Sequence, residues 1–366
     1  MQNKIKLTIL GFFLIILFIE FISNNNCKDK KFLKNDGIMY ALSLDGVDVS
    51  SFPFKGPYRV IVSCEGADGK WLYDDWKLSV DNITGDVTCD IKFQTISKKY
   101  LNNYIIGLSG TAQGNGEVVN ENGYRYEGKS PNNYVWFNNE YWRIIGVFDS
   151  SSHGQSNKNL VKIIRAEILN ALVWDTGYND WGKSSLKSLL NDAYYNAKNG
   201  TDSGYCYGYN SAVTANCNYT KKRIQSEYKN MIVNATWYLG GSSSYVKTVE
   251  TLYSEERGSS TSATGYIGLM YVSDYGYSVL SSSCARTTYF SSYNSSSCSG
   301  SSWLYGKGNE WTINCDSSGR TGRISYLGFV ESSRFTSVFR PVAYLDSSVY
   351  VIDGDGSLEN PYIIGM

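Results

Sequence analysis

The chain has 366 residues, of which 42% are apolar and 19% are charged, and its 34 basic side chains are balanced by 34 acidic ones. This is enough apolar material for two folded domains, and it excludes a chain that is disordered throughout. Neutrality, without a basic run in a recognisable nucleic-acid module, argues against nucleic acid as a partner. The unusual counts are 31 tyrosines and 9 tryptophans beside 5 prolines and 1 histidine.

Residues 1–24 predict a membrane anchor or signal segment. Two lysines precede an apolar run from Leu7 to Ile22 that only Glu20 interrupts, a length between the core of a signal peptide and a full span of about 20 residues. Signal peptidase prefers small residues, and Phe21–Ser23 offers only one, so an uncleaved transmembrane helix is favoured over a cleaved signal. Residues 25–36 form a charged tether. We expect a single-pass protein of the cell membrane with the bulk of the chain extracellular.

Residues 37–96 predict a small all-β domain resembling a sandwich. Turn signals such as Asp45-Gly46 and Thr84-Gly85 separate runs with strand-like patterns. Cys64 and Cys89 each lie in such a run, and a disulfide between them would stabilise a domain too small for a large core. Two buried free thiols are the alternative. The four runs are 39–43, 58–64, 76–80 and 87–93.

Residues 97–123 predict a helix followed by a linker. Apolar residues recur at three- and four-residue spacing from Ser97 to Leu108, which indicates a short amphipathic helix. Polar and glycine-rich sequence follows over 109–123. The second domain is therefore expected to cover 124–366.

Tyr134–Phe148 reads YVWFNNEYWRIIGVF and predicts a β-hairpin. Asn138 and Asn139 form its turn, since asparagine tolerates the positive φ of a tight hairpin turn. The second arm is apolar on both faces apart from Arg143 and Gly146, which is typical of a central strand. Later segments alternate short strands, helices such as the serine-capped run Ser184–Leu190, and loops. The fold class expected for this domain is α+β with long loops.

Four segments of the second domain resemble a known family. NNYVWFNNEYWRIIGVF, NDWGKSSLKSLLN, FRPVAYL and DGDGSLENPY are similar to a domain of unassigned function in surface proteins of Gram-positive gut bacteria. That domain is similar to the C-type-lectin-like fold of formylglycine-generating enzymes. The resemblance implies that the hairpin and the FRPVAYL strand lie side by side. It does not imply oxidase activity, because those enzymes use a late, closely placed cysteine pair and no cysteine follows Cys315.

The spacing of the eight cysteines argues against a metal site, because it contains no CxxC pair and only one histidine is available. In an exported protein, disulfides are the simpler interpretation. We expect pairs between cysteines that are neighbours in sequence, with Cys27 and Cys315 left without an assigned partner. The pairs are Cys64 with Cys89, Cys206 with Cys217 and Cys284 with Cys298.

Residues suited to catalysis are few, and an enzyme is the less favoured interpretation. His153 has no evident partner in the sequence, and no catalytic residue is assigned. Acidic pairs such as Glu255-Glu256, or Asp175 and Asp180, are more typical of solvated helix faces or turns than of acid–base chemistry on sugars. Asp353 and Asp355 have the alternate spacing of calcium ligands, but an aspartate-capped turn is favoured over a calcium site. No other cofactor is expected.

The favoured function is binding. Tyrosine and tryptophan offer rigid apolar faces, and serine and asparagine offer adaptable hydrogen bonds. The tyrosine-rich loops are the candidate ligand site, while six tryptophans (136, 142, 174, 181, 237 and 311) are expected mainly in the core. We expect an extracellular ligand-binding or adhesion protein with a carbohydrate or protein ligand; a glycan-active enzyme on the same fold and a purely structural surface protein are the alternatives. The candidate tyrosines are Tyr205, Tyr207, Tyr209, Tyr275, Tyr277, Tyr289 and Tyr293.

Overall fold

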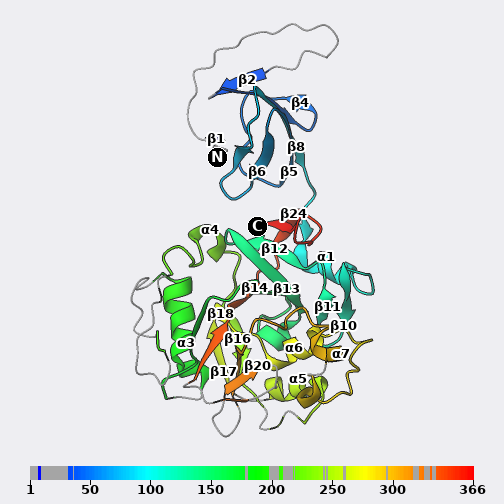
Figure 1. Ribbon diagram of the computed structural model, residues 1–366, viewed down its shortest axis with the longest axis vertical. Coiled ribbons are helices and arrows are strands. Elements are labelled where there is room, and N and C mark those ends of the chain that lie inside the picture. Colours follow the sequence, from blue (N-terminus) through cyan, green and yellow to red (C-terminus); the bar gives the residue numbers. More distant parts are fainter. Residues whose placement is uncertain are drawn as a thin grey trace. The chain divides into compact units, whose positions relative to one another are not determined.

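The structure, a computed structural model, divides the chain into two compact units that meet in sequence between Lys98 and Lys99. Figure 1 colours both units along the sequence. The residues described are 7–9, 32–35, 37–177, 180–197, 206–208, 217, 219–241, 244, 246–258, 261–293, 296–315, 321–324, 330–331 and 335–366.

The described part of the chain is mostly β, with 40% of its residues in strands and 18% in helices. The α+β, C-type-lectin-like architecture expected from the sequence is therefore wrong. Predicted helices proved short: in the amphipathic segment from Ser97 to Leu108 only Leu101–Gly107 is α-helical. Glycine-rich sequence expected to be a linker instead holds a strand at Asn115–Asn120. The periodicity of apolar residues overestimated the helix content, because pairing with distant strands determines the conformation of such short segments.

Only three residues of the expected N-terminal membrane helix are described, and they form a strand. Leu7–Ile9 is strand β1, paired with β7 of the first unit. The rest of the apolar run to Ile22 lies outside the described residues. Within the residues described, no helix has the length and apolar character needed to cross a membrane.

The first unit is built from two sheets, and the four strands expected in it are β3, β5, β7 and β8. One sheet has the order β2-β3-β8-β5 with β4 beside β3, and the other has the order β1-β7-β6. Alternate residues of β8 are buried, as expected for a strand with one face on a core. The bounds are β2 (Phe32–Asn35), β3 (Ile38–Leu44), β4 (Val47–Asp48), β5 (Tyr58–Glu65), β6 (Asp68–Leu72), β7 (Lys77–Asp81) and β8 (Val87–Thr95).

Aromatic rings fill the core of the first unit. Trp71 contacts both Trp76 and Phe93 edge to face, with ring centroids 5.2 and 5.1 Å apart. Phe52 meets the same tryptophan at 5.2 Å. Edge-to-face pairs of this kind contribute about 0.5–1.5 kcal/mol each beyond the burial of their area.

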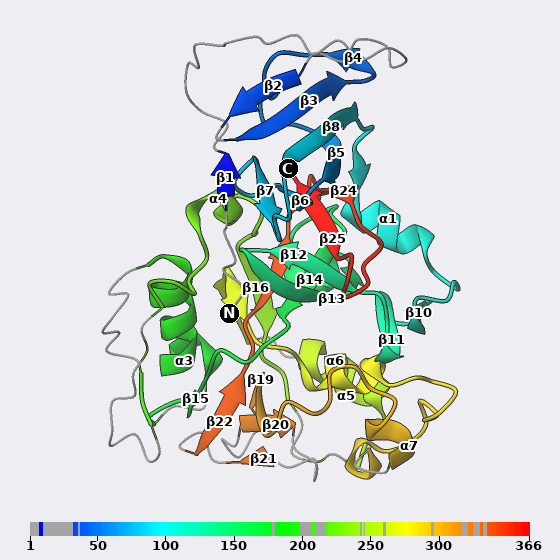
Figure 2. The same cartoon turned by 45° about the horizontal axis from the view of Figure 1, so that its top comes forward.

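The second unit is organised around a ten-stranded sheet with the central order β18-β23-β14-β13-β12-β25-β24-β9, and β11 joins β10 to β13. In Figure 2, α3 and the α5–α7 group lie on different sides of these strands. The bounds are β9 (Lys99–Tyr100), β10 (Asn115–Asn120), β11 (Tyr124–Ser130), β12 (Tyr134–Phe137), β13 (Glu140–Phe148), β14 (Leu160–Arg165), β18 (Ile267–Gly268), β23 (Val342–Leu345), β24 (Tyr350–Asp353) and β25 (Tyr362–Gly365).

The predicted hairpin is confirmed as β12 and β13. Phe137 and Glu140 face each other across a two-residue turn in which Asn138 and Asn139 have φ of 58° and 59°. β13 also pairs with β14 and β11, so it is the central strand that its two apolar faces indicated. The expected contact between the hairpin and the FRPVAYL strand is not found, because β14 lies between β13 and β23.

Smaller sheets and short helices complete the second unit. The serine cap predicted for the helix at 184–190 is confirmed, since the Ser184 hydroxyl accepts a hydrogen bond from the backbone N–H of Lys187 at 3.1 Å. The remaining strands are β15 (Asn170–Val173), β16 (Ala235–Tyr238), β17 (Ser262–Gly265), β19 (Glu310–Cys315), β20 (Thr321–Ile324), β21 (Val330–Glu331) and β22 (Thr336–Phe339). The helices are α1 (Leu101–Gly107), α2 (Ser150–His153), η1 (Trp181–Lys183), α3 (Ser185–Ser188), the π-helix η2 (Leu189–Tyr195), α4 (Ser226–Lys229), α5 (Val249–Gly258), α6 (Val272–Ser278), η4 (Phe290–Ser292) and α7 (Ser296–Ser299).

Candidate functional site

Three of the tyrosines expected to bind a ligand are buried. Tyr275, Tyr277 and Tyr293 expose only 2–3% of their surface. Tyr275 packs edge to face on Phe290 and Tyr293, with centroids 5.6 and 6.2 Å apart. These side chains belong to the interior around α6, because tyrosine can bury its ring once its hydroxyl is accommodated. Composition marked the region as aromatic, but it did not distinguish a core from a surface.

The other predicted tyrosines are divided between the surface and segments that are not described. Tyr289 is 52% exposed and stands at the N-cap of η4. Tyr207 is half-buried, and its carbonyl accepts a hydrogen bond from the N–H of Val173. Tyr205 and Tyr209 lie outside the described residues. Of the five candidate tyrosines that are described, only Tyr289 is largely exposed.

Asp353 and Asp355 stabilise a turn. The carboxylate of Asp355 accepts a hydrogen bond from the N–H of Ser357, and that of Asp353 accepts one from the N–H of Gly354, both at 2.9 Å. The backbone N–H of Asp355 also closes the turn onto the carbonyl of Asn360. Among the residues described, no three His, Cys, Asp or Glu side chains gather in a way that could hold a metal ion.

His153 is fully buried at the end of α2. Its Nε2 lies 3.1 Å from the carbonyl of Phe148, and its Nδ1 accepts a hydrogen bond from the N–H of Gln155. Burial lowers the pKa of the ring, although the bond to Phe148 acts in the opposite direction. Both nitrogens are engaged by the backbone, so the imidazole connects α2 to β13.

The acidic pairs considered for sugar chemistry are engaged in structural bonds. Asp175 accepts hydrogen bonds from the backbone N–H groups of Gly177 and Ser185. Asp180 caps η1 through the N–H of Gly182. Such bonds hold the carboxylates in turns and at helix starts, where they satisfy backbone donors.

The three predicted disulfides are present: Cys64–Cys89, Cys206–Cys217 and Cys284–Cys298. Cys64 and Cys89 are also direct partners across β5 and β8. Cys27 lies outside the described residues. Cys315 is the last residue of β19, and only the backbone of this residue is described.

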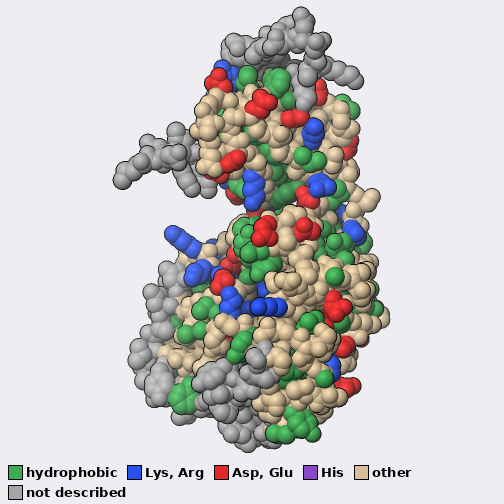
Figure 3. All heavy atoms as spheres, turned by 45° about the vertical axis from the view of Figure 1, so that its right-hand side comes forward, with side chains coloured by type: hydrophobic (Ala, Val, Ile, Leu, Met, Phe, Trp, Pro, Cys, Tyr) green, Lys and Arg blue, Asp and Glu red, His purple; other side chains and the backbone are tan. Residues whose placement is uncertain are grey.

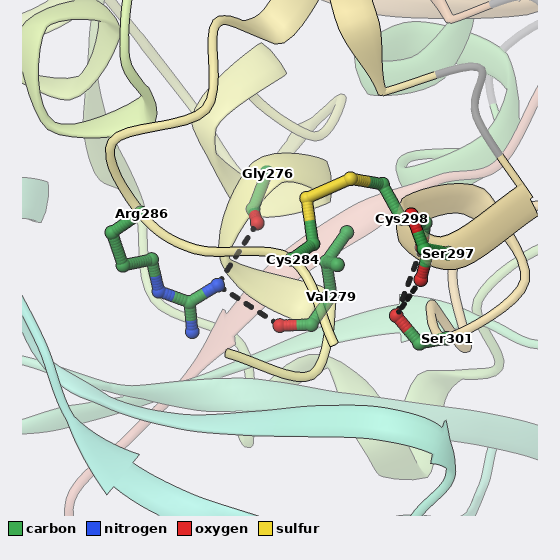
Figure 4. The surroundings of a disulfide bond; sticks show 7 residues. All are labelled: Gly276, Val279, Cys284, Arg286, Ser297, Cys298 and Ser301. Atoms are coloured by element: carbon green, nitrogen blue, oxygen red, sulfur yellow. Dashed lines mark hydrogen bonds between the residues drawn. A yellow bond between two sulfur atoms is a disulfide. The ribbon is translucent and has the colours of Figure 1, made fainter. Parts of the chain in front are cut away.

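Figure 4 shows the surroundings of the Cys284–Cys298 bond. The serine-rich loop is held there by more than the disulfide, because Arg286 donates hydrogen bonds to the carbonyls of Val279 at 2.9 Å and Gly276 at 3.4 Å. The guanidinium also pairs with Glu121 and Glu127 of the β10–β11 region. This loop is therefore an ordered part of the second unit.

The second unit encloses five charged side chains that we name the ion cluster: Arg125, Lys162, Glu256, Arg257 and Asp274. Asp274, in the first turn of α6, binds Arg125 with one carboxylate oxygen at 3.0 Å and Lys162 with the other. Glu256 pairs with Arg257 at 3.2 Å and accepts hydrogen bonds from Ser273. All five side chains are at least 91% buried.

Burial and opposite charge decide the ionisation of the ion cluster. Burial lowers the pKa of Lys162 to about 8, against the raising effect of Asp274. Burial alone would raise the pKa of Asp274, but the charges of Lys162 and Arg125 bring it down to about 2. The ammonium also lies 4.4 Å from the centroid of the Tyr271 ring. The side chains of the ion cluster are buried, and their bonds connect α6 to β11, to β14 and to α5.

One group of aromatic rings lies outside the core, on the outer face of the β12–β13 hairpin. We name Tyr134, Trp136 and Tyr141 the aromatic platform. Trp136 and Tyr141 are cross-strand partners with rings perpendicular at 5.1 Å, and Tyr134 meets Tyr141 at 6.0 Å. Tyr141 is 38% exposed, and the other two rings are half-buried. In the parallel pairing with β25, Ile363 stands beside Trp136.

The sequence predicts neither feature. Its pattern places Trp136 mainly in the core with the other tryptophans, whereas the five others are fully buried and Trp136 is not. Strict alternation along β12, with Val135 and Phe137 inward, was the signal that placed Tyr134 and Trp136 outward. The ion cluster joins residues up to 149 positions apart, and no local pattern announces such a contact.

Charge does not concentrate on the face drawn in Figure 3, where Lys and Arg alternate with Asp and Glu among uncharged side chains. This agrees with the net neutrality of the chain. This face therefore shows no concentrated charge that would attract a strongly charged ligand.

No protein-family model, curated protein or solved structure matches this chain. The resemblance to a surface-protein domain thus rests on the four sequence segments alone.

Proposed function

We propose that the protein works outside the cytoplasm, at the outer side of the cell membrane, as a binding protein whose aromatic platform contacts the ligand. The three disulfides support the location, since such bonds persist in oxidising compartments. The observation that carries the binding role is that three large rings of one hairpin pack on one another outside the core.

A glycan is the ligand that the platform suits best. Sugar rings present apolar C–H faces, and tyrosine and tryptophan rings offer complementary faces at small cost in conformational entropy. Arg143 is buried and supports the platform, because its guanidinium lies 4.4 Å from the centroid of Tyr134 and the same distance from that of Trp303. A protein ligand is the other outcome of the same test.

The binding experiment compares two surfaces. The purified protein is tested against a glycan panel, peptidoglycan and host surface proteins, together with the variants Trp136→Ala, Tyr141→Ala and Tyr289→Ala. Loss of a central aromatic contact is expected to weaken binding about tenfold or more. Weakening by the first two variants alone supports the platform, and weakening by Tyr289→Ala alone assigns binding to the serine-rich loop.

Absence of binding across the whole panel would contradict the binding role and favour a structural surface protein. Location is tested separately by protease treatment of intact cells and by thiol labelling. Release of fragments of the second unit, with the six paired cysteines unreactive, is the expected result. Full protection with free thiols would place the protein inside the cell.

A further inference from the structure

The ion cluster contains more buried cations than carboxylates. Arg125, Lys162 and Arg257 face Asp274 and Glu256. The three cations lie close together, because Arg125 and Lys162 share the carboxylate of Asp274, and Lys162 and Arg257 both contact the ring of Tyr271, 4.4 and 4.7 Å from its centroid. Like charges in a low-dielectric interior are costly unless opposite charge offsets them.

Two guanidinium groups of the ion cluster also have donors without acceptors. Arg125 uses Nε on the carbonyls of Glu121 and Asn122 and Nη1 on Asp274, while its Nη2 is buried without a hydrogen-bond partner. Arg257 uses Nη1 on Glu256, and its Nη2 is likewise buried and unpartnered. Both guanidinium groups lie against the ring of Tyr253, at 5.5 and 3.7 Å from its centroid.

The nearest further charges are already engaged. Arg286 binds the carboxylates of Glu121 and Glu127, and Glu127 also accepts hydrogen bonds from the backbone and hydroxyl of Ser281. The ring of Tyr277 contacts both Arg125 and Arg286, with guanidinium carbons 4.5 and 5.4 Å from its centroid. These carboxylates offset the charge of the region as a whole, but they leave both Nη2 groups unpartnered.

We propose that the ion cluster binds a small inorganic anion of the size of chloride at the Nη2 groups of Arg125 and Arg257. A buried donor without an acceptor is destabilising, and more so when it is charged, so an acceptor at this place is strongly favoured. An anion supplies the acceptor that both groups lack. A monatomic anion is favoured because rings already lie against both guanidinium groups: Phe148 and Tyr277 are each 4.5 Å from that of Arg125, and Tyr253 and Tyr271 are 3.7 and 4.7 Å from that of Arg257. The site is independent of the aromatic platform.

The first test is crystallographic and uses the full chain with bromide in place of chloride. The expected result is an anomalous difference peak within hydrogen-bonding distance of Nη2 of Arg125 or Arg257. A water molecule without anomalous signal at both groups, or side chains that satisfy them directly, would overturn the proposal.

The second test measures thermal unfolding in sodium chloride and in sodium gluconate at equal ionic strength. A ligand that binds only the folded state raises the unfolding temperature with the logarithm of its concentration. We expect this rise in chloride but not in gluconate for the wild type, and we expect its loss in Arg257→Gln. Equal unfolding temperatures in both salts for the wild type would contradict an anion site.

Arg165→Gln is the matched control. Arg165 is also a buried arginine, on the same strand as Lys162, but its Nε, Nη1 and Nη2 all bind acceptors on Glu140, Glu167 or Ile168. Its variant should lose stability yet retain the chloride dependence. Retention of the dependence in Arg257→Gln would show a general salt effect, and its loss in both variants would show that it does not depend on Arg257 in particular; either result would overturn the proposal. If Arg257→Gln fails to fold, the bromide experiment on the wild type still decides.

Discussion

The two units use different interactions to hold their interiors. In the first unit the core consists of aromatic and aliphatic side chains, and its described ion pairs, Lys77 with Asp75 and Lys92 with Asp90, keep at least one partner largely exposed. In the second unit Asp274 and Lys162 are fully buried and paired. The first unit relies on burial of apolar area, and the second adds directional bonds between charges.

The difference between the two interiors follows from the size of the units. A small unit has little interior in which water can be excluded from a charged group, so rings and a disulfide are its available means of stabilisation. The larger unit has to dock helices on a sheet in one register, and apolar contact alone is not directional. Buried charge pairs specify that register at the cost of desolvation.

The largest expected effect comes from Asp274→Asn, which should lower the free energy of unfolding of the second unit only. It leaves Arg125 and Lys162 without their carboxylate, and removing one partner of a buried pair costs about 3–5 kcal/mol. The free energy of unfolding, measured in urea with a probe in each unit, should fall for the second unit and stay unchanged for the first.

Asp180→Asn is the control for this change. Asp180 is partly exposed and caps η1, so its loss should cost about 1 kcal/mol or less. Equal losses from the two variants would mean that the ion cluster contributes no more than a helix cap.

The next effect is expected in the first unit on removal of its disulfide by Cys64→Ala with Cys89→Ala. The bond closes a segment with a sequence separation of 25, and the loss of that constraint on the unfolded chain corresponds to about 3 kcal/mol. Denaturation should show the first unit unfolding at lower urea and the second unchanged. A loss below about 1 kcal/mol would show that pairing of β5 with β8 holds this unit without the crosslink.

A smaller effect is the pH dependence of the second unit. Because the pKa of Asp274 is lowered to about 2 from 3.8, the stability it contributes is complete above about pH 4 and is lost as the pH falls toward 2. The gap in unfolding free energy between the wild type and Asp274→Asn should narrow by about 2 kcal/mol over that window. Urea titrations at several pH values measure it. A gap that stays constant down to pH 2 would contradict the assigned ionisation.

The smallest expected effect concerns the hairpin turn. Asn139 has a φ of 59°, and a β-branched residue there should cost about 1–2 kcal/mol, whereas Asn139→Gly should change the stability by less than about 0.5 kcal/mol. Thermal unfolding of Asn139→Val beside Asn139→Gly measures the difference. Equal unfolding temperatures would mean that the turn does not need this conformation.

Local chemistry in the sequence predicted local structure well. Asn138 and Asn139 predicted a turn with positive φ, Ser184 predicted a cap, and neighbouring cysteines predicted their own pairing. In each case the interaction that determines the structure is local in sequence, because it spans a few residues or closes one loop.

Features that depend on distant contacts could not be predicted in this way. The tyrosine at 275 was expected on a surface because nothing nearby indicates that Phe290 and Tyr293 pack around it. The sequence around Asp274 does not indicate that this residue is buried and paired, because its partners lie in β11 and β14. Short amphipathic runs suggested an α+β fold, but strand pairing far along the chain made most of the described structure β.

The pairing of β12 with β25 has a consequence for how the protein is made. The hairpin occupies the middle of the sheet, yet its parallel neighbour is the strand at Tyr362–Gly365, and β24 in turn pairs with β9 at the start of the same unit. During translation the ribosome therefore releases β9 and β12 long before their partners exist. β13 can pair with β12 at once, but the edge of β12 that takes β25 and the edge of β9 that takes β24 stay open until synthesis has nearly finished, and open strand edges are the usual sites of mispairing and aggregation.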